Sequence, residues 1–161
     1  MVHNISGDAL VVSKGGILCH QTNFFGVMGA GIAAAIKAKL LSHENYIDYV
    51  HVCKKLGRKT LGMVQFLNTP DGTVVANCFS QDDKCMAYPG NRISPVTDYN
   101  AMRKCFHTVC TYAFTTGKNA YVPYKIGCGI AGGDWQTVEA ILNDEFSHSR
   151  VNLYIVRMDN K

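Results

Sequence analysis

Residues 24–36 read FFGVMGAGIAAAI, a glycine-rich turn that leads into an alanine-rich stretch. The residues just before it, 16–22, form a largely apolar run that is typical of a buried strand. A strand, a glycine turn and a helix in this order bring backbone N–H groups and the positive end of a helix dipole to one point, which favours phosphate oxygens. The stretch therefore predicts an α/β domain whose first glycine turn grips a diphosphate.

The same residues nearly match the fingerprint of dinucleotide-binding enzymes. Gly29-Ala30-Gly31-Ile32-Ala33-Ala34 fits its alanine variant. That fold also needs an acid about 20 residues later at the end of a second strand. Glu44 and Asp48 are at this distance but fall in a predicted helix. A nicotinamide-binding protein is therefore the weaker alternative.

A second glycine turn follows another apolar run. Residues 126–135 read IGCGIAGGDW, after a predicted buried strand at 120–126 and before a predicted helix at 134–148. Glycine permits positive φ and close backbone approach, so two such turns at one edge of a sheet suit a clamp on one ligand. Cys128 within this turn is either a thiol of lowered pKa near backbone amides or a small residue that fills the turn.

Apolar periodicity elsewhere alternates between strand and helix, as in an α/β layered domain. Asp71-Gly72 predicts an antiparallel hairpin between two of the strands, and residues 80–95 are too long for a tight turn and are a candidate functional loop. The predicted strands are 2–5, 9–12, 16–22, 62–67, 73–79, 120–126 and 151–158, and the predicted helices are 28–40, 42–57, 97–116 and 134–148.

Composition limits the class of protein. The 161 residues suit one domain over 1–161, and 47% hydrophobic with 17% charged residues is typical of a globular protein. No apolar run of about 18 residues and no secretory leader occur, so we expect a cytoplasmic protein without membrane contact. The seven cysteines form no CxxC pair, and we expect no disulfide framework, no metal and no cofactor. The net charge of +4 is dispersed and falls short of a nucleic-acid footprint.

Four motifs in order carry a resemblance to a known family. They are Gly7-Asp8, HQTNFFGVMGAGIAAAIK at 20–37, ANCFSQ at 76–81, and IGCGIAGGDW at 126–135. In this order the chain resembles a macrodomain throughout its length, most closely the branch of the yeast-type ADP-ribose-1″-phosphate phosphatase and of relatives that remove ADP-ribose from protein or DNA. The resemblance implies a three-layer α/β/α sandwich with a mixed central sheet and a cleft for ADP-ribose.

The resemblance also implies roles for particular residues. Asp8 matches the acid that accepts a hydrogen bond from the adenine amine, with Ala9 beside it, and Asn23 matches the asparagine near the distal ribose. Tyr154 is either a wall of the adenine site or a core tyrosine. The remaining expected ADP-ribose-binding residues are Gly29, Gly31, Ile32 and Ala33 in the first turn, Gly127, Cys128, Gly129, Ile130, Ala131 and Gly132 in the second, and Ser80 and Gln81 at the end of the closing strand.

Hydrolysis needs a positioned water and a base near the distal ribose. His20 resembles the histidine of the phosphatase branch, and its alternative reading is a satisfied strand histidine. Asn23 would orient the ribose, and Asp82 and Asp83 would assist the base or merely solvate their loop. Related enzymes that use a lysine and an aspartate carry them where this chain has Gln81 and Ala131, so the resemblance favours a direct-water reaction.

The expected function is hydrolysis of ADP-ribose-1″-phosphate or removal of ADP-ribose from a modified macromolecule. The alternative is a reader module that binds ADP-ribose without turnover. The expected partner is ADP-ribose or an ADP-ribosylated substrate, with nucleic acid only if it carries that modification, and we expect a monomer.

Overall fold

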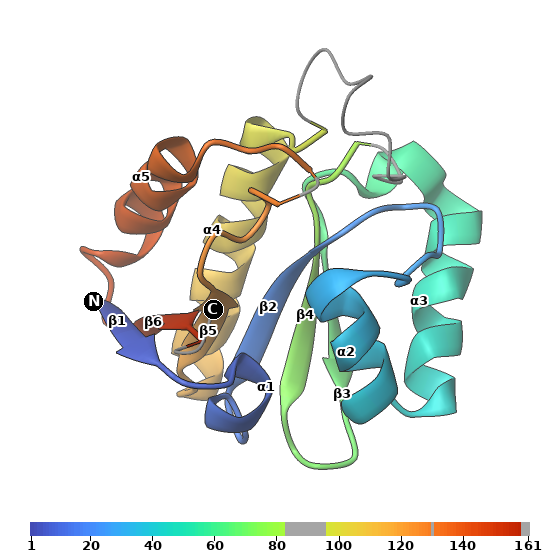
Figure 1. Ribbon diagram of the computed structural model, residues 1–161, viewed down its shortest axis with the longest axis horizontal. Helices are drawn as coiled ribbons and strands as arrows, with labels where there is room; N and C mark the ends of the chain where they lie inside the picture. The colour runs from blue at the N-terminus through green and yellow to red at the C-terminus, as the bar shows by residue number, and fades with distance from the viewer. Residues whose placement is uncertain (83–95, 130, 159–161) are drawn as a thin grey trace.

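The computed structural model describes residues 1–82, 96–129 and 131–158 (Figure 1). The strands are β1 (Val2–Ser6), β2 (Ile17–Thr22), β3 (Val64–Asn68), β4 (Val74–Phe79), β5 (Ala120–Pro123) and β6 (Leu153–Arg157). The helices are α1 (Ala9–Val12), α2 (Gly31–Lys39), α3 (His43–Leu56), the 3-10 turn η1 (Gly57–Thr60), α4 (Tyr99–Thr116) and α5 (Trp135–Phe146).

The six strands form one mixed sheet in the order β1-β6-β5-β2-β4-β3. All neighbouring pairs are parallel except β3 and β4, which form the predicted antiparallel hairpin at one edge. The dinucleotide-binding fold has the order 3-2-1-4-5-6, so the nicotinamide alternative does not fit this topology. Because five of the strands run in the same direction, their carboxyl ends meet at one edge of the sheet.

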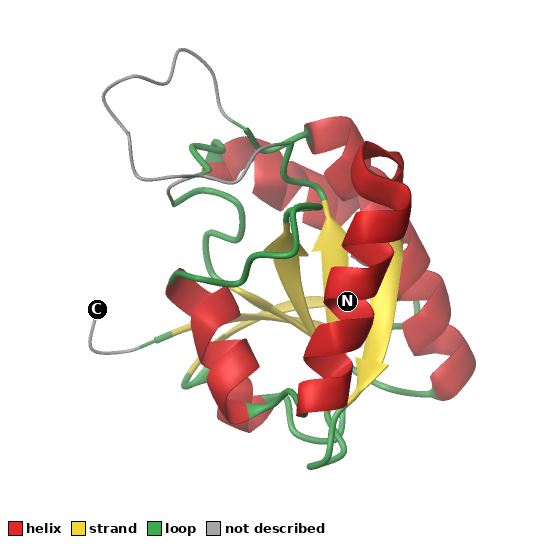
Figure 2. Ribbon diagram, turned by 90° about the vertical axis from the view of Figure 1, so that its right-hand side faces the viewer, coloured by secondary structure: helices red, strands yellow, loops and turns green. Residues whose placement is uncertain are grey.

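Helices cover both faces of the sheet and complete a three-layer α/β/α sandwich (Figure 2). Side chains along β2 alternate between the layers. Ile17 and Cys19 pack in the cluster that includes Phe106 of α4 and Leu142 of α5, whereas Leu18 packs with Ile36 of α2. The predicted fold class is confirmed, and β2 lies near the middle of the sheet with a buried residue set on each face.

Capping residues explain where several helices begin. Ser42 and Asn45 form a capping box at the start of α3, and Asp134 caps α5 by accepting a hydrogen bond from the Thr137 N–H. Both starts agree with the sequence. No helix in the described part of the chain is long and apolar enough to cross a membrane.

Two predicted elements differ in the structure. Residues 9–12 were expected as a strand but form α1, because the Asp8 side chain accepts a hydrogen bond from the Leu10 N–H and starts a helical turn. The strand expected over 120–126 ends at Pro123. Lys125 has a φ of +63°, and the Ile126 N–H bonds to the Pro123 carbonyl, so the chain turns there.

Candidate functional site

A cleft of about 720 Å³ opens where β1, β5 and β6 end. It brings together two regions that the sequence nominated separately, the Gly7-Asp8 turn and the start of α2. The lining residues are Gly7, Asp8, Ala9, Leu10, Gly31, Ile32, Ala35, Lys39, Pro123, Tyr124, Lys125, Val156, Arg157 and Met158.

Asp8 caps helix α1 and also lines the cleft. Its Oδ1 accepts the Leu10 N–H at 3.0 Å and so caps α1. An ionised carboxylate has about four lone-pair sites. Capping therefore leaves Asp8 with acceptor capacity for a donor in the cleft, and the buried Ala9 lies beside it.

The start of α2 supplies the cleft with backbone donors. Its N-cap is Ala30, which has no side-chain acceptor, and the first turn contains no acidic residue. Gly31 has a φ of +58°, which lets the chain turn sharply into the helix. The first-turn N–H groups and the helix dipole therefore favour an anion beside Gly31 and Ile32.

The two other residues of the first glycine turn that were expected to bind ligand are not among the cleft-lining residues. Ala33 packs against the cluster of Met28, Tyr49, Cys53 and Phe79. Gly29 lies before the N-cap of α2. In this structure, the first turn contributes to the cleft mainly through Gly31 and Ile32.

Three cations of the cleft were not identified from the sequence. Lys39, Lys125 and Arg157 line it together with the carboxylate of Asp8. The Arg157 guanidinium carbon lies 3.8 Å from the centroid of the Tyr124 ring, and this stacking holds the charge at the carboxyl end of β6. Lys125 and Arg157 lie at or just after the carboxyl ends of β5 and β6, which was an available signal, whereas Lys39 is the last residue of α2.

Tyr154 does not line the cleft. Its ring stacks on those of Tyr121, at 5.1 Å between centroids, and His3, at 5.0 Å. The aromatic residue that lines the cleft is instead Tyr124. The core interpretation of Tyr154 therefore fits the structure.

The second glycine turn lies at the same edge of the sheet, after β5, the neighbour of β2. Gly127 has a φ of +74°, and a Cβ added there would lie 2.9 Å from both Gln21 Oε1 and Met102 Cε. A Cβ on Gly133 would collide with the carbonyl oxygen of Gly127. Glycine is therefore required at both positions by backbone conformation or close contact.

The other residues of this turn have varied surroundings. Ala131 is buried, and its carbonyl oxygen accepts the Val96 N–H at 3.0 Å. The Gly132 N–H closes a tight turn onto the Gly129 carbonyl. Ile130 lies outside the described residues. None of the described residues of 127–132 lines the cleft that contains Asp8.

Cys128 is not an activated thiol. Burial, and next the negative charge of Asp134, raise the pKa of Cys128 to about 11, with Lys125 opposing them. Its Sγ lies 3.4 Å from the Ile126 carbonyl oxygen. The thiol therefore stays protonated near neutral pH, and Cys128 is better explained as a small residue that fills the turn.

His20 is enclosed within the sandwich. Its side chain is 0% exposed, and its Nε2 lies 2.6 Å from Asn77 Oδ1 on β4, while Asn77 donates to Gln65 Oε1 on β3. Burial lowers the pKa of His20 to about 4, with the Asn77 hydrogen bond acting against it. His20 is thus neutral at pH 7 and belongs to a polar row across three strands. Its Nδ1 is buried without a hydrogen-bond partner among the described residues, so only one of its two ring nitrogens is satisfied. A role as base stays a prediction.

Asn23 organises the backbone of the first turn. Its Nδ2 donates to the Val27 carbonyl at 2.9 Å, and its Oδ1 accepts the Phe25 N–H at 2.9 Å and the Tyr49 hydroxyl at 3.1 Å. Only 6% of the residue is exposed. The amide therefore holds the turn in shape, and contact with a ribose stays a prediction.

The end of the closing strand is held by polar contacts of its own. Asp82 forms a two-point ion pair with Arg58 at 2.6 Å. Ser80 is 1% exposed and donates from Oγ to Gln21 Oε1, while Gln81 forms a bridge with Thr97. Asp83 lies outside the described residues. Within the described residues, Asp82 is engaged by Arg58, and its assistance to a base stays a prediction.

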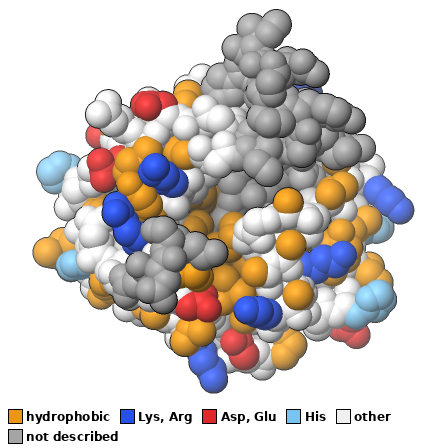
Figure 3. Space-filling view, in the orientation of Figure 1, with side chains coloured by type: hydrophobic (Ala, Val, Ile, Leu, Met, Phe, Trp, Pro, Cys, Tyr) orange, Lys and Arg blue, Asp and Glu red, His pale blue; other side chains and the backbone are white. Residues whose placement is uncertain are grey.

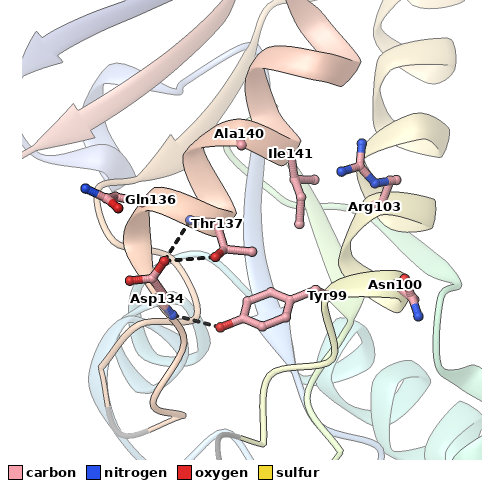
Figure 4. A pocket seen from close by; sticks show the side chains of 8 residues that line it. All are labelled: Tyr99, Asn100, Arg103, Asp134, Gln136, Thr137, Ala140 and Ile141. Carbon is pink, nitrogen blue, oxygen red and sulfur yellow. Dashed lines mark hydrogen bonds between the residues drawn. The ribbon is translucent and has the colours of Figure 1, made fainter.

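A second, more open hollow of about 430 Å³ lies between the first turns of α4 and α5 (Figure 4). Tyr99 and Asp134 meet there, since the Asp134 N–H donates to the Tyr99 hydroxyl. Asp134 Oδ2 accepts from both the backbone and the hydroxyl of Thr137. Tyr99, Asp134 and Thr137 therefore bond to one another, and Arg103, which also lines the hollow, pairs with Asp144.

On the face shown in Figure 3, the described lysine and arginine side chains are interspersed with hydrophobic and acidic ones. This dispersal agrees with the sequence and contrasts with the continuous basic stripe of a nucleic-acid-binding surface.

Comparisons with known proteins place the fold. No family model matches the chain, and no curated protein matches it either. A solved protein of unknown function from Bacteroides thetaiotaomicron is 28% identical, with a TM-score of 0.83 and 98% of each chain covered. A macrodomain protein from Streptomyces coelicolor is 22% identical, with a TM-score of 0.77 over 99% of this chain and 100% of that one.

A third similar structure is that of Thermosipho africanus DarTG in complex with ADP-ribose. It is 17% identical, with a TM-score of 0.71 over 98% of this chain and 42% of that one. The sheet order, the layers and these likenesses agree, and the chain has the macrodomain fold.

Proposed function

We propose that this protein binds ADP-ribose in the cleft that contains Asp8 and the start of α2. The observation that carries the proposal is the pairing of a carboxylate with an uncapped helix N-terminus in one cleft. Adenine presents an N–H donor that suits Asp8, and a diphosphate suits the backbone donors at Gly31 and Ile32. One ligand that carries both groups meets both features.

The charge of the cleft supports the same ligand. Lys39, Lys125 and Arg157 against Asp8 make the lining cationic. A diphosphate carries negative charge that these side chains offset. The similar DarTG structure, which is a complex with ADP-ribose, supports the choice among nucleotide diphosphates.

The proposal is tested by calorimetric titration of ADP-ribose into the wild-type protein and an Asp8→Asn variant. We expect a wild-type Kd on the order of micromolar. Asparagine still caps α1 but has lost the charge, so we expect affinity to fall about tenfold, as for loss of a hydrogen bond to a charged group. Asp71→Asn is the control, because Asp71 bonds Thr73 in the hairpin turn at the other end of β4. Absence of wild-type binding would refute the proposal.

Hydrolysis at the distal ribose is the second candidate, carried by the likeness of HQTN and the glycine turns to the phosphatase branch. His20 is buried, and Asn23 and Asp82 are bonded within the protein, so the described residues support binding more directly than turnover. Release of phosphate from ADP-ribose-1″-phosphate, and of ADP-ribose from modified protein or DNA, is assayed in the same samples. Binding without either release identifies a reader.

A further inference from the structure

A chain of four polar groups connects the closing strand to the second glycine turn. Ser80 Oγ lies 2.9 Å from Gln21 Oε1, Gln21 Nε2 lies 3.1 Å from Thr97 Oγ1, and Thr97 Oγ1 lies 2.7 Å from the Gly127 carbonyl oxygen. Gln21 is at its centre, next to His20 on β2 but on the opposite face of the sheet. None of these contacts belongs to the cleft that contains Asp8.

The direction of each hydrogen bond in the chain follows from its last member. The Gly127 carbonyl is an acceptor only, so Thr97 must use its single hydroxyl proton there. Thr97 then has only lone pairs to offer Gln21, and the Gln21 amide must present its NH₂ group to Thr97. The amide oxygen consequently faces Ser80 and accepts the Ser80 proton. A side chain with a donor at one end and an acceptor at the other is required at position 21.

The Gly127 carbonyl receives two bonds that have different effects. The Gly133 N–H, at 2.9 Å, closes the turn onto itself, whereas the Thr97 hydroxyl ties the turn to the body of the protein. A second tie joins the Val96 N–H to the Ala131 carbonyl. The turn is therefore held from segment 96–97. Backbone hydrogen bonds to residues 80–82 hold that segment, and the Gln21 amide adds the side-chain bond to the Thr97 hydroxyl.

Gln21 also touches the backbone of the turn. Its Oε1 lies where a Cβ on Gly127 would approach to 2.9 Å, so the amide packs directly against the Gly127 Cα. Ser80 and Thr97 are buried, so water does not readily replace the amide in this chain of bonds.

We propose that Gln21 is the positioning residue of the second glycine turn and thereby sets the affinity of the protein for the diphosphate of its ligand. The ligand part of this inference rests on the proposed function and on a diphosphate that extends from Gly31 and Ile32 toward the second turn, which lies at the same edge of the sheet but outside the lining of the cleft that contains Asp8. Gln21 acts through Thr97 and Gly127 and does not touch the ligand.

The test uses the near-isosteric Gln21→Glu variant of the full chain. A carboxylate accepts hydrogen bonds but does not donate them. The Thr97 hydroxyl therefore donates to the new carboxylate, and the Gly127 carbonyl loses its hydrogen bond from Thr97. In the absence of ligand, we expect amide hydrogen exchange to accelerate in segment 127–133 and to stay unchanged in α2. Unchanged exchange in 127–133 overturns the positioning role, whether or not ADP-ribose binds.

Titrations then test the ligand part. In Gln21→Glu we expect ADP-ribose affinity to fall about tenfold, the scale of one lost hydrogen bond, because the Gly127 carbonyl keeps only its bond from the Gly133 N–H. Adenosine, which lacks the diphosphate and the distal ribose, should bind the variant as tightly as it binds the wild type. An equal loss for both ligands, or no loss, overturns the assignment. A third outcome is that exchange accelerates in Gln21→Glu while the wild-type protein does not bind ADP-ribose. That outcome refutes the proposed function and the ligand part, and it leaves the positioning role standing.

Thr97 provides the matched variants. Thr97→Val removes the proton that bonds Gly127 while keeping the side-chain shape, and we expect it to reproduce the Gln21→Glu effect. Thr97→Ser keeps the hydroxyl and should restore wild-type exchange and affinity. The double variant Gln21→Glu/Thr97→Val should be no worse than either single variant, because both break the same tie. Additive losses contradict the chain of bonds.

Discussion

The two glycine turns look alike in sequence but are supported in different ways. The first, before α2, is held by side chains from its own layer: Tyr46 donates to the Gly26 carbonyl at 2.8 Å, and Tyr49 donates to the Asn23 carbonyl at 2.8 Å. The second is held from across the sheet through Thr97, whose hydroxyl bonds the Gly127 carbonyl.

The difference shows that glycine spacing sets the backbone conformation of a turn but not which side chains hold the turn in position. In the first turn, phenol groups of α3 lie beside the backbone that they hold, so helix packing and turn geometry stabilise each other. In the second, the supporting residues come from β2 and the segment before α4, which are distant in sequence. β2 supports the second turn through Gln21, whereas the preceding residue, His20, faces the opposite layer and bonds Asn77 of β4.

The largest expected effect is that of Gly127→Ala. A Cβ there meets Met102 and Gln21 at 2.9 Å, and φ is +74°, so the free energy of unfolding should fall by about 2–4 kcal/mol from overpacking and backbone strain. Gly129→Ala is the control in the same turn, since its Cβ would have no neighbour within 4 Å. Chemical denaturation measures both. Equal losses would show that the second turn does not depend on its contact with Gln21.

His20 makes the stability of the protein depend on pH. Its folded pKa of about 4 lies below the usual histidine pKa of 6.5, so the unfolded chain binds the proton more readily. Stability is therefore full above pH 6.5 and falls as the pH decreases toward 4, by up to about 3 kcal/mol.

Unfolding curves between pH 7.5 and pH 4.5 measure the His20 effect against His20→Gln, whose curve should be flatter. His148→Gln at an exposed site is the control and should keep the wild-type slope. The same slope in His20→Gln and wild type would mean that the acid sensitivity arises elsewhere than β2.

The smallest expected effect belongs to the first turn. Tyr49→Phe leaves the buried ring in place but removes its hydroxyl from the Asn23 carbonyl and side chain, and we expect a loss of about 1–2 kcal/mol in unfolding free energy. Tyr112→Phe is the control, because the Tyr112 ring stacks on Phe66 on the other face of the sheet. If Tyr49→Phe is as stable as wild type, the first turn is held by Asn23 and Tyr46 without a contribution from the Tyr49 hydroxyl.

Much of the site was predictable because it depends on neighbours in sequence. Asp8, Gly31 and Ile32 each follow or start an element whose pattern is visible, and all three line the cleft. Arg157 and Lys125 were missed because a cationic side chain at the end of a strand is usually interpreted as exposed to solvent. Only the strand order shows that both lie at one cleft. Their meeting at Tyr124 depends on β5 and β6 pairing in parallel.

His20 and Asn23 show the opposite limit. Motif likeness nominated both for chemistry, yet the burial of His20 against Asn77 follows from the pairing of β2 with β4, which local pattern does not specify. Asn23 has three partners within its turn and α3, so its amide has a structural task there.

The sequence by itself determined the alternation of strands and helices, the two glycine turns and the α/β fold class, because hydrophobic period and backbone freedom are local properties of the chain. The tertiary structure alone decided which polar groups meet. Strand order placed Gln21 between Ser80 and Thr97, and it enclosed His20 while leaving Asp8 in the cleft. Such contacts join residues far apart in the chain, and only packing brings them within hydrogen-bonding distance.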